Sequence, residues 1–247
     1  TVIPSHGLSD ELLRSITALY DSVTKHDILL CVIDNVTPDE SVYNVCRTHP
    51  AWSEGSITYV RLPWNAAFAR ASNTGIHVLR QVDAFLFLNN DCYVEPGCVD
   101  KMVSALMSGK GHIIGAKLLY PDGTVQHAGG MIKGKWEAVL HEFRGYAADA
   151  PEVIKSRNVP FVTGACMMVK ASPFVRLGGF MECFNNGYED VDLCFRFIEN
   201  FMGVYYCADA VAIHEEAQTP GRKDHETDNK VMFFTHWSKT DPKKFSK

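Results

Sequence analysis

Phe85-Leu-Phe-Leu-Asn89-Asn90-Asp91-Cys92 is an apolar run that ends abruptly in three polar side chains. A short apolar run with polar residues after it is typical of a strand that is buried on both faces. In open α/β sheets the ligand crevice lies at the carboxyl ends of the strands, so Asp91 stands where a carboxylate can hold a metal at a diphosphate. The same residues also suit an Asn/Asp turn that merely ends a strand, and this stretch alone supports both interpretations equally.

Strands and helices alternate on both sides of this stretch. Apolar runs predict strands over 27–34, 57–62 and 84–88, and apolar stripes predict helices over 10–24, 66–82 and 97–108. Such alternation is typical of βαβ units, so we expect an α/β protein with a mainly parallel sheet. Further strands are predicted over 112–120, 161–169, 203–207 and 210–214, with a helix that begins at Glu189-Asp190 and a helix-like segment over 231–237.

Composition limits the class of protein. The chain has 247 residues, of which 46% are hydrophobic, which suits a single domain with one sizeable core. The formal net charge is 24 − 29 = −5, so no overall positive field is available to attract nucleic acid. The longest apolar runs, such as 28–33, are far shorter than the roughly 20 residues that span a bilayer, so no transmembrane segment is expected.

Cysteine usage and missing motifs narrow the choice further. The eight cysteines form no C-x-x-C pair, and four of them lie in apolar stretches, so we expect reduced thiols. Reduced thiols are typical of a cytoplasmic protein. We expect such a protein to reach the inner face of a membrane only through other regions or partners. The N-terminus lacks an initiator Met and a secretory signal, which indicates a processed or excised piece of a longer protein. The dinucleotide, P-loop, zincin and α/β-hydrolase motifs are absent from the sequence.

Three other places carry candidate chemistry. Asp34 ends a predicted strand, where it can accept a hydrogen bond from a base or ribose, although a turn is equally common there. Glu189, Asp190 and Asp192 crowd the first turn of a predicted helix. Complementing the helix dipole is worth about 0.3–1 kcal/mol and does not need three carboxylates, which favours a catalytic role. His214 ends another apolar run, and together with Asp91 it is a credible ligand for Mn²⁺ or Mg²⁺.

Several motifs occur together in a fixed order. They are Asp34, the segment from Asn65 to Asn73-Thr-Gly75, Leu88-Asn-Asn-Asp91, Asp122-Gly-Thr-Val-Gln-His127-Ala-Gly, Val162-Thr-Gly-Ala-Cys-Met-Met-Val169, Gly178-Gly-Phe180, Tyr188-Glu-Asp-Val-Asp-Leu-Cys194 and Asp209-Ala-Val-Ala-Ile-His214. Over residues 1–216 the chain thus resembles the family 2 inverting glycosyltransferases, particularly the branch with bacterial rhamnosyltransferases and other enzymes of polysaccharide biosynthesis.

The resemblance implies a GT-A fold, with a mainly parallel central sheet flanked by helices in one domain over 1–247. Residues 1–120 would form a Rossmann-like half that binds the nucleotide-sugar, and residues 121–216 the acceptor and catalytic half. Residues 217–247 would form a polar C-terminal tail and helix. Within the second half, the insert 121–158 is expected to be an acceptor-side loop or lid, and a solvated variable loop is equally well supported.

The resemblance also implies a reaction and its residues. It suggests a metal-dependent transfer of a hexosyl or deoxyhexosyl group from a UDP- or dTDP-sugar to a hydroxyl of a glycan or lipid-linked glycan. Asp190 would be the general base, Glu189 an acceptor contact, and Asp91 and His214 the ligands of Mn²⁺ or Mg²⁺. Asp34 would contact the base, and Asn89 the ribose. The full set of residues expected to bind the donor is Pro4, Ser5, Asp34, Asn65, Asn73, Asn89, Asn90, Gly164 and Ala165.

The sequence departs from the family pattern and leaves alternatives. Asn65-Ala66-Ala67-Phe68 stands where many relatives have Asn-x-Gly-Phe, and Asn89 at the first position of the D-x-D motif leaves one carboxylate for a metal. A sugar-nucleotide pyrophosphorylase would need a Gly-rich basic loop after the first strand, which Ser5-His6-Gly7-Leu8 lacks. A catalytically silent module that binds nucleotides or carbohydrates is the alternative from another class.

Overall fold

The computed structural model describes residues 1–23, 25–216 and 224–245, so part of the polar tail expected over 217–247 lies outside the described residues. The strands are β1 (Val2–Ser5), β2 (Leu30–Asp34), β3 (Ile57–Arg61), β4 (Ala84–Leu88), β5 (Cys92–Val94), β6 (Ile113–Leu119), β7 (Val125–His127), β8 (Gly130–Lys133), β9 (Ala138–His141), β10 (Arg157–Asn158), β11 (Cys166–Lys170) and β12 (Val204–His214). The helices are α1 (Ser9–Asp21), α2 (Ser41–Thr48), α3 (Pro50–Ser53), α4 (Ala67–Val78), α5 (Cys98–Met107), α6 (Ala171–Arg176), α7 (Glu189–Glu199), α8 (Glu226–Trp237) and the 3₁₀ turn η1 (Pro242–Phe245).

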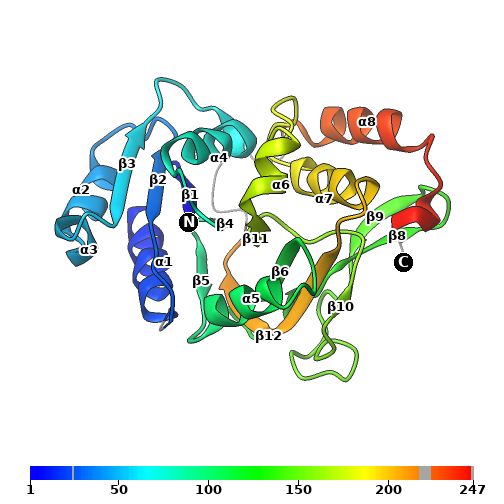
Figure 1. Ribbon diagram of the computed structural model, residues 1–247. Coiled ribbons are helices and arrows are strands. Elements are labelled where there is room, and N and C mark those ends of the chain that lie inside the picture. The colour runs from blue at the N-terminus through cyan, green and yellow to red at the C-terminus, as the bar shows by residue number, and fades with distance from the viewer. Residues whose placement is uncertain (24, 217–223, 246–247) are drawn as a thin grey trace.

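One mixed sheet runs through both halves of the chain (Figure 1). Its main order is β10-β12-β6-β11-β4-β1-β2-β3, with β5 paired to β12 and β7 paired to β6. The neighbours β4, β1, β2 and β3 are parallel, whereas β11 runs antiparallel to both β4 and β6. The predicted α/β class is confirmed, and the parallel part of the sheet brings the carboxyl ends of β1, β2 and β4 to a common edge.

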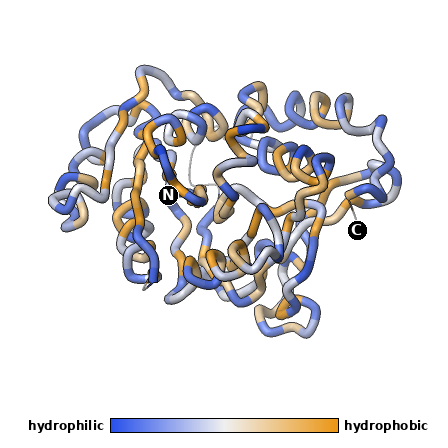
Figure 2. The backbone as a smooth tube through the Cα atoms, viewed as in Figure 1, coloured by the Kyte–Doolittle hydropathy of each residue, from blue (hydrophilic) through white to orange (hydrophobic). Residues whose placement is uncertain are grey.

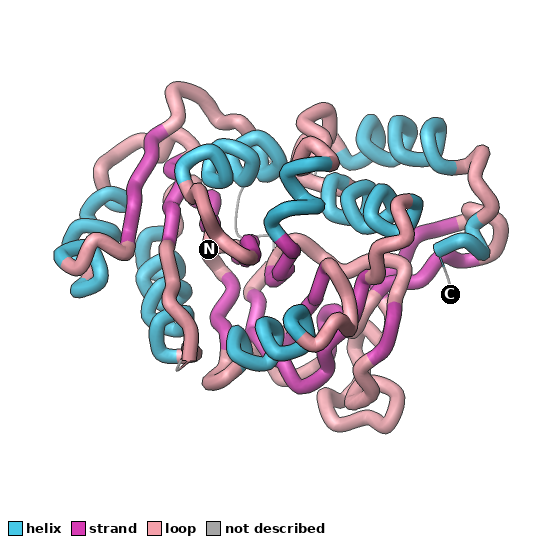
Figure 3. The backbone as a smooth tube through the Cα atoms, in the orientation of Figure 1, coloured by secondary structure: helices cyan, strands magenta, loops and turns pink. Residues whose placement is uncertain are grey.

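Helices cover the sheet on both faces (Figure 3). One apolar core joins the sheet to α1, α2 and α5, through side chains such as Leu12 and Met102. A second core joins it to α4, α6, α7 and α8, through side chains such as Phe174 and Phe233. Apolar sequence is concentrated in the strands between these layers (Figure 2). All eight cysteines are free thiols in the structure.

The structure shortens or joins several predicted elements. The strand expected over 161–169 begins only at Cys166, because residues 161–165 leave the sheet and the Gly164 N–H donates to a side chain instead of a neighbouring strand. The strands expected over 203–207 and 210–214 are one strand, β12, whose register shifts between Cys207 and Val211. The helix expected over 66–82 ends at Val78, and Gln81 has a positive φ of 59° that no α-helix accommodates.

The insert 121–158 is an ordered part of the fold. Within it β8 and β9 form a hairpin, and Trp136 in the connection between them is 8% exposed. Its ring packs edge-on against Phe233, Phe234 and Phe245, and its indole N–H donates to the Thr240 carbonyl oxygen at 2.7 Å. The hairpin is therefore anchored to the C-terminal helix. This packing favours neither of the two expectations for the insert, a free lid or a solvated loop.

Candidate active site

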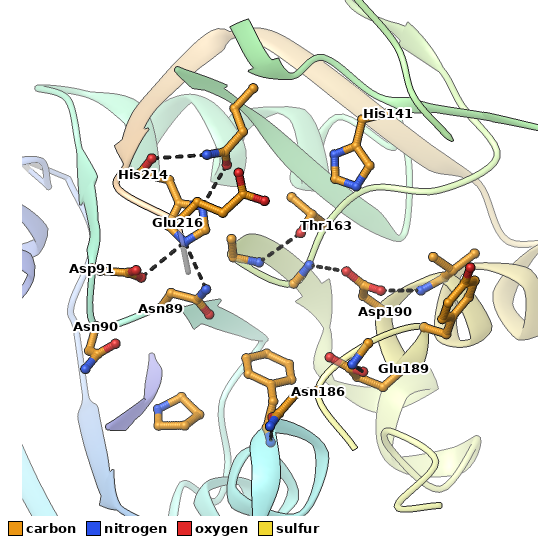
Figure 4. Close-up of a pocket in the computed structure, with 18 of the residues that line it drawn as sticks. Asn89, Asn90, Asp91, His141, Thr163, Asn186, Glu189, Asp190, His214 and Glu216 are labelled. Carbon is orange, nitrogen blue, oxygen red and sulfur yellow. Dashed lines mark hydrogen bonds and ion pairs between the residues drawn. The ribbon is translucent and has the colours of Figure 1, made fainter. Parts of the chain in front are cut away.

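A cavity of about 420 Å³ lies at the carboxyl ends of β1 and β4. Its lining includes most of the candidate residues: Pro4, Ser5, Asn65, Asn89, Asn90, Asp91, Gly164, Ala165, Glu189, Asp190 and His214. Asp91 and His214 lie on one side of the cavity, and Asp190 and Glu189 lie on the opposite side (Figure 4). Asp91 lies about 100 residues before Asp190 in the sequence, yet both face one space, which the antiparallel strand β11 makes possible by joining the two halves of the sheet.

The first group is Asp91 with His214. Both are almost fully buried, and His214 Nε2 lies 3.1 Å from Asp91 Oδ1 and 3.1 Å from the amide nitrogen of Asn89. Pairing of β5 with β12 aligns Cys92 with His214 in register, so the backbone ladder itself sets this contact. A histidine at a strand end therefore meets the aspartate that follows β4.

Gln126 determines which nitrogen of His214 faces Asp91. Its amide nitrogen donates to the His214 carbonyl oxygen at 3.1 Å, so its oxygen is the atom that lies 2.7 Å from His214 Nδ1. Nδ1 therefore carries a proton, and the Nε2 lone pair faces the Asp91 carboxylate unless a second proton lies between them. Gln126 belongs to the Asp122–Gly129 motif, but the motif predicts no role for it. The position of Gln126 in the sequence does not indicate that it contacts His214.

This donor set fits a divalent cation. An imidazole lone pair and a carboxylate oxygen that lie 3.1 Å apart at the cavity wall would suit two ligands of one divalent cation. The described residues contain no group of three or more His, Cys, Asp or Glu side chains that could hold a metal. Asp91 and His214 thus supply only part of a coordination shell, and a diphosphate would have to supply more.

Asp190 lies at the start of α7, opposite this pair. Its Oδ2 accepts from the Gly164 N–H at 2.9 Å, and its Oδ1 accepts from the Val191 N–H at 2.8 Å. The helix begins after Tyr188, whose positive φ of 71° turns the chain into the helix. A β-carbon at Gly164 would meet the Phe68 ring at 3.1 Å, so Gly164 allows this close approach of the loop. The carboxylate is thereby fixed at the cavity surface.

The two neighbouring carboxylates of α7 differ in their surroundings. Glu189 lines the cavity, is 6% exposed, and accepts from the Gly187 N–H at 2.6 Å. Asp192 does not line it, and accepts instead from Arg196 Nε at 2.7 Å and from the Trp237 indole N–H at 3.1 Å. Asp192 therefore joins α7 to α8 and is a structural residue.

Asn35 and its neighbours build the wall near β2. The Asn35 oxygen accepts from the Ala66 N–H at 2.6 Å, and the Asn65 oxygen accepts from the Ala67 N–H at 3.0 Å. Ala67 has a positive φ of 56° at the position where many relatives have glycine. Asn35, which lines the cavity, was not a candidate because a strand-end Asn resembles an ordinary turn residue.

Replacing Ala67 by glycine should stabilise the protein. A β-carbon in the left-handed region costs about 1–2 kcal/mol, so we expect Ala67→Gly to raise the free energy of unfolding by about 1 kcal/mol. Ala69→Gly is the matched control, because Ala69 lies buried inside α4 and the same change there should lower stability by about 1 kcal/mol. Urea unfolding of both variants measures the two effects, and a loss of stability in both would contradict the prediction.

Two expected donor-binding residues lie away from the cavity lining. Asp34 has no exposed surface, and its carboxylate accepts from the Thr37 N–H at 2.8 Å and the Tyr59 hydroxyl at 2.6 Å. Asn73 is 9% exposed and binds the backbone of Phe180 with both ends of its amide. The structure gives both side chains contacts within the fold, so a contact with the nucleotide stays a prediction for each of them.

Asp34→Ala should therefore lower stability. It leaves the Thr37 N–H and the Tyr59 hydroxyl without this acceptor, which costs about 1–3 kcal/mol of unfolding free energy. Asp34→Asn, which keeps one acceptor oxygen, should lose less. Thermal melts and donor titrations on both variants separate the roles: a fully stable Asp34→Ala protein with weak donor binding would favour the base contact over a structural role.

The far rim of the cavity comes from the insert and the end of β12. Arg144 Nη2 lies 2.6 Å from Glu216 Oε2, and both Arg144 and Glu216 bind the Tyr120 hydroxyl. Burial raises the pKa of Glu216, but the Tyr120 hydroxyl and the Arg144 charge outweigh burial and leave this pKa below its usual value. His141 lines the same rim and lies against the buried His127. Burial holds the pKa of His127 well below its usual range, so His127 is neutral.

Comparison with known proteins places the chain in a family. The family model described as "Glycosyl transferase family 2" matches residues 1–178. The chain belongs to this family. The match ends before Asp190 and His214, so it does not by itself assign roles to the acidic helix or to the end of β12. Members of this family are glycosyltransferases, enzymes that take a sugar from a nucleotide-sugar donor.

Individual relatives are more distant. The chain is 33% identical to the "O-antigen biosynthesis protein RfbC" of Myxococcus xanthus over 165 residues, which cover 64% of this chain and 13% of RfbC. It is 28% identical over 232 residues to "N-acetylglucosaminyl-diphospho-decaprenol L-rhamnosyltransferase" of Mycobacterium tuberculosis, covering 85% of this chain and 74% of that protein. The chain thus spans only a small part of the first relative.

A solved structure supports the GT-A fold. The mannosyltransferase PcManGT from Pyrobaculum calidifontis, in complex with GDP-Man and Mn²⁺, superimposes with a TM-score of 0.70 at 15% identity. The alignment covers 99% of this chain and 65% of PcManGT. Among the residues that the structure describes, no helix is long and apolar enough to cross a bilayer.

Proposed function

We propose that the chain transfers a sugar with inversion, from a nucleoside diphosphate to a hydroxyl of a glycan or lipid-linked glycan. The observation that carries this proposal is the position of Asp190 across the cavity from the Asp91–His214 pair (Figure 4). In-line displacement needs a base on the acceptor side and stabilisation of the leaving group on the other side. One cavity offers both.

Asp190 serves as the general base. As the acceptor oxygen attacks the anomeric carbon, the bond from that carbon to the diphosphate oxygen breaks and the acceptor proton moves to Asp190. The backbone N–H groups of Gly164 and Val191 hold the carboxylate in position for this transfer. Glu189, at the same helix start, contacts the acceptor. No covalent intermediate with the protein is required.

Asp91 and His214 would hold Mn²⁺ or Mg²⁺, with Gln126 orienting His214. When bound, the ion supplies positive charge next to the departing diphosphate. PcManGT was solved with Mn²⁺ as well as GDP-Man, which is consistent with this assignment. Because two protein ligands hold such an ion weakly, nucleotide and metal should bind together.

The first half, 1–120, forms the donor side, and 121–216 forms the acceptor side of one domain that extends over 1–247. Pro4, Ser5 and Asn90 line the donor wall, where the Asn90 amide donates to the Ser5 hydroxyl at 3.0 Å. We expect a UDP- or dTDP-sugar as donor. The names of the two relatives, an O-antigen biosynthesis protein and a rhamnosyltransferase, support a deoxyhexose or hexose donor and a lipid-linked acceptor in polysaccharide biosynthesis.

A thermal-shift panel tests the donor class directly. The panel contains UDP-, dTDP- and GDP-sugars, each with and without Mn²⁺, because a ligand that binds only the folded state raises the apparent melting temperature. We expect one nucleoside diphosphate class to shift the melting temperature only when Mn²⁺ is present. That donor, incubated with an octyl glycoside acceptor, should then give a product of inverted anomeric configuration by NMR. Retention of configuration would rule out the proposed mechanism, and binding without turnover would favour the silent module.

A further inference from the structure

Two histidines meet at the acceptor side of the cavity. His127 ends β7, His141 ends β9, and their Nδ1 atoms are 3.0 Å apart. The rings cross edge to face with centroids 4.7 Å apart, and both pack near Phe161. His141 lines the cavity and lies above Thr163 in the view of Figure 4. A buried imidazole therefore supports one at the cavity surface.

The buried member of this pair has an unusual environment. His127 has no exposed surface, and its Nε2 has no hydrogen-bond partner among the described residues. A buried N–H without an acceptor is rarer in proteins than an acceptor with an unused lone pair. The proton of neutral His127 should therefore not lie on Nε2.

The short contact between the two Nδ1 atoms then determines which nitrogen of each histidine carries the proton. A hydrogen bond between two Nδ1 atoms needs one N–H and one lone pair. If His141 donated, neutral His127 would have to carry its own proton on Nε2, as a buried donor without a partner. With the proton on His127 Nδ1, His127 donates to His141 Nδ1, and neutral His141 carries its proton on Nε2.

We infer that His127 is a positioning residue that fixes His141 as an Nε2–H donor to an oxygen of the acceptor sugar. This inference rests on the proposed function, since it assigns a contact within the same site. A neutral N–H donor suits a hydroxyl or acetamido oxygen of a sugar. The insert that carries both histidines also lines the cavity through Val139, His141 and Arg144, and the acceptor must enter this cavity for its hydroxyl to reach Asp190.

Nitrogen-15 NMR tests the proton positions without any substrate. In protein labelled with ¹⁵N-histidine, long-range ¹H–¹⁵N correlations at neutral pH distinguish the two tautomers, and His127→Phe and His141→Gln assign the signals. We expect the Nδ1–H tautomer for His127 and the Nε2–H tautomer for His141. A proton on Nδ1 of His141 would overturn the inference.

Kinetics test the role in acceptor binding. His127→Phe keeps a ring and removes both the unpaired Nε2 and the bond to His141, so the melting temperature should not fall. The KM for an octyl glycoside acceptor should rise by about 2–10-fold, the equivalent of one neutral hydrogen bond, with donor affinity unchanged. His127→Asn should restore the parent KM, because the Asn amide nitrogen takes the place of Nδ1 and donates to His141.

A double variant separates positioning from packing. His141→Gln places an amide nitrogen near the position of Nε2 and no longer depends on His127, so adding His127→Phe should raise KM no further. If His127→Phe left the acceptor KM unchanged while transfer continued, the inference alone would fail. If the chain transferred no sugar at all, the proposed function would fail, and the NMR result would still decide the proton positions.

Discussion

Asp190→Asn should lower turnover by about 10²–10⁴-fold, the usual worth of a positioned proton acceptor. The amide has nearly the same size as the carboxylate and keeps one oxygen for the N–H of Gly164 or Val191. It cannot take up the acceptor proton. Because the proposed metal and diphosphate site at Asp91 and His214 lies across the cavity, donor affinity should stay nearly unchanged, and the loss should appear in kcat.

Asp192→Asn is the matched control for this variant. It makes the same change of charge and shape two residues along the same helix, but at a side chain that binds Arg196 and Trp237. We expect turnover close to that of the parent protein and a lower melting temperature, because the buried ion pair with Arg196 is weakened. Sugar transfer and thermal melts on both variants therefore distinguish catalysis from helix capping. Near-normal transfer by Asp190→Asn would move the base to Glu189.

Much of the fold could be predicted because, in most strands and helices, the apolar pattern of the sequence matches the face that the element buries in the core. The buried strands β2 and β4 appear as uninterrupted apolar runs, and α1 and α5 as single apolar stripes, since each contacts the core along its whole length. The predicted strand bounds were wrong where a backbone N–H group binds a side chain instead of a neighbouring strand. Residues 161–165 are as apolar as a strand, but the Gly164 N–H binds Asp190, which is distant in sequence.

The candidate site shows the same limit. Residue type pointed to Asp91 and His214 at strand ends and to Asp190 at a helix start as candidates, because carboxylates and an imidazole at such places are conspicuous in a sequence. Gln126, Asn35 and the His127–His141 pair were not assigned roles, since their importance depends on which atoms they face across the sheet. Asp34 shows the converse: a strand-end carboxylate is conspicuous in the sequence, yet its partners Thr37 and Tyr59 lie inside the fold.

Asp91→Asn should lower turnover by about 10²–10⁴-fold, and should also remove the effect of metal on donor binding. In the proposed mechanism the ion would contribute several kcal/mol of charge stabilisation at the leaving group, and each 1.36 kcal/mol is a factor of ten in rate. With Asn89 already an amide, this variant leaves no carboxylate in the Asn89-Asn90-Asp91 motif. The introduced amide would still donate to His214 Nε2, so the fold should be retained.

Donor titrations with Mn²⁺ and with EDTA measure this effect. The parent protein should bind the nucleoside diphosphate more tightly with Mn²⁺, whereas Asp91→Asn should bind it equally weakly in both conditions. Asp209→Asn removes an exposed carboxylate from β12, the strand that carries His214, and should behave like the parent. Since Asp91 and His214 offer too few ligands to hold an ion alone, neither protein should bind Mn²⁺ tightly without nucleotide. Equal donor affinity of the parent with and without metal would show that Asp91 and His214 pair through a proton and hold no ion.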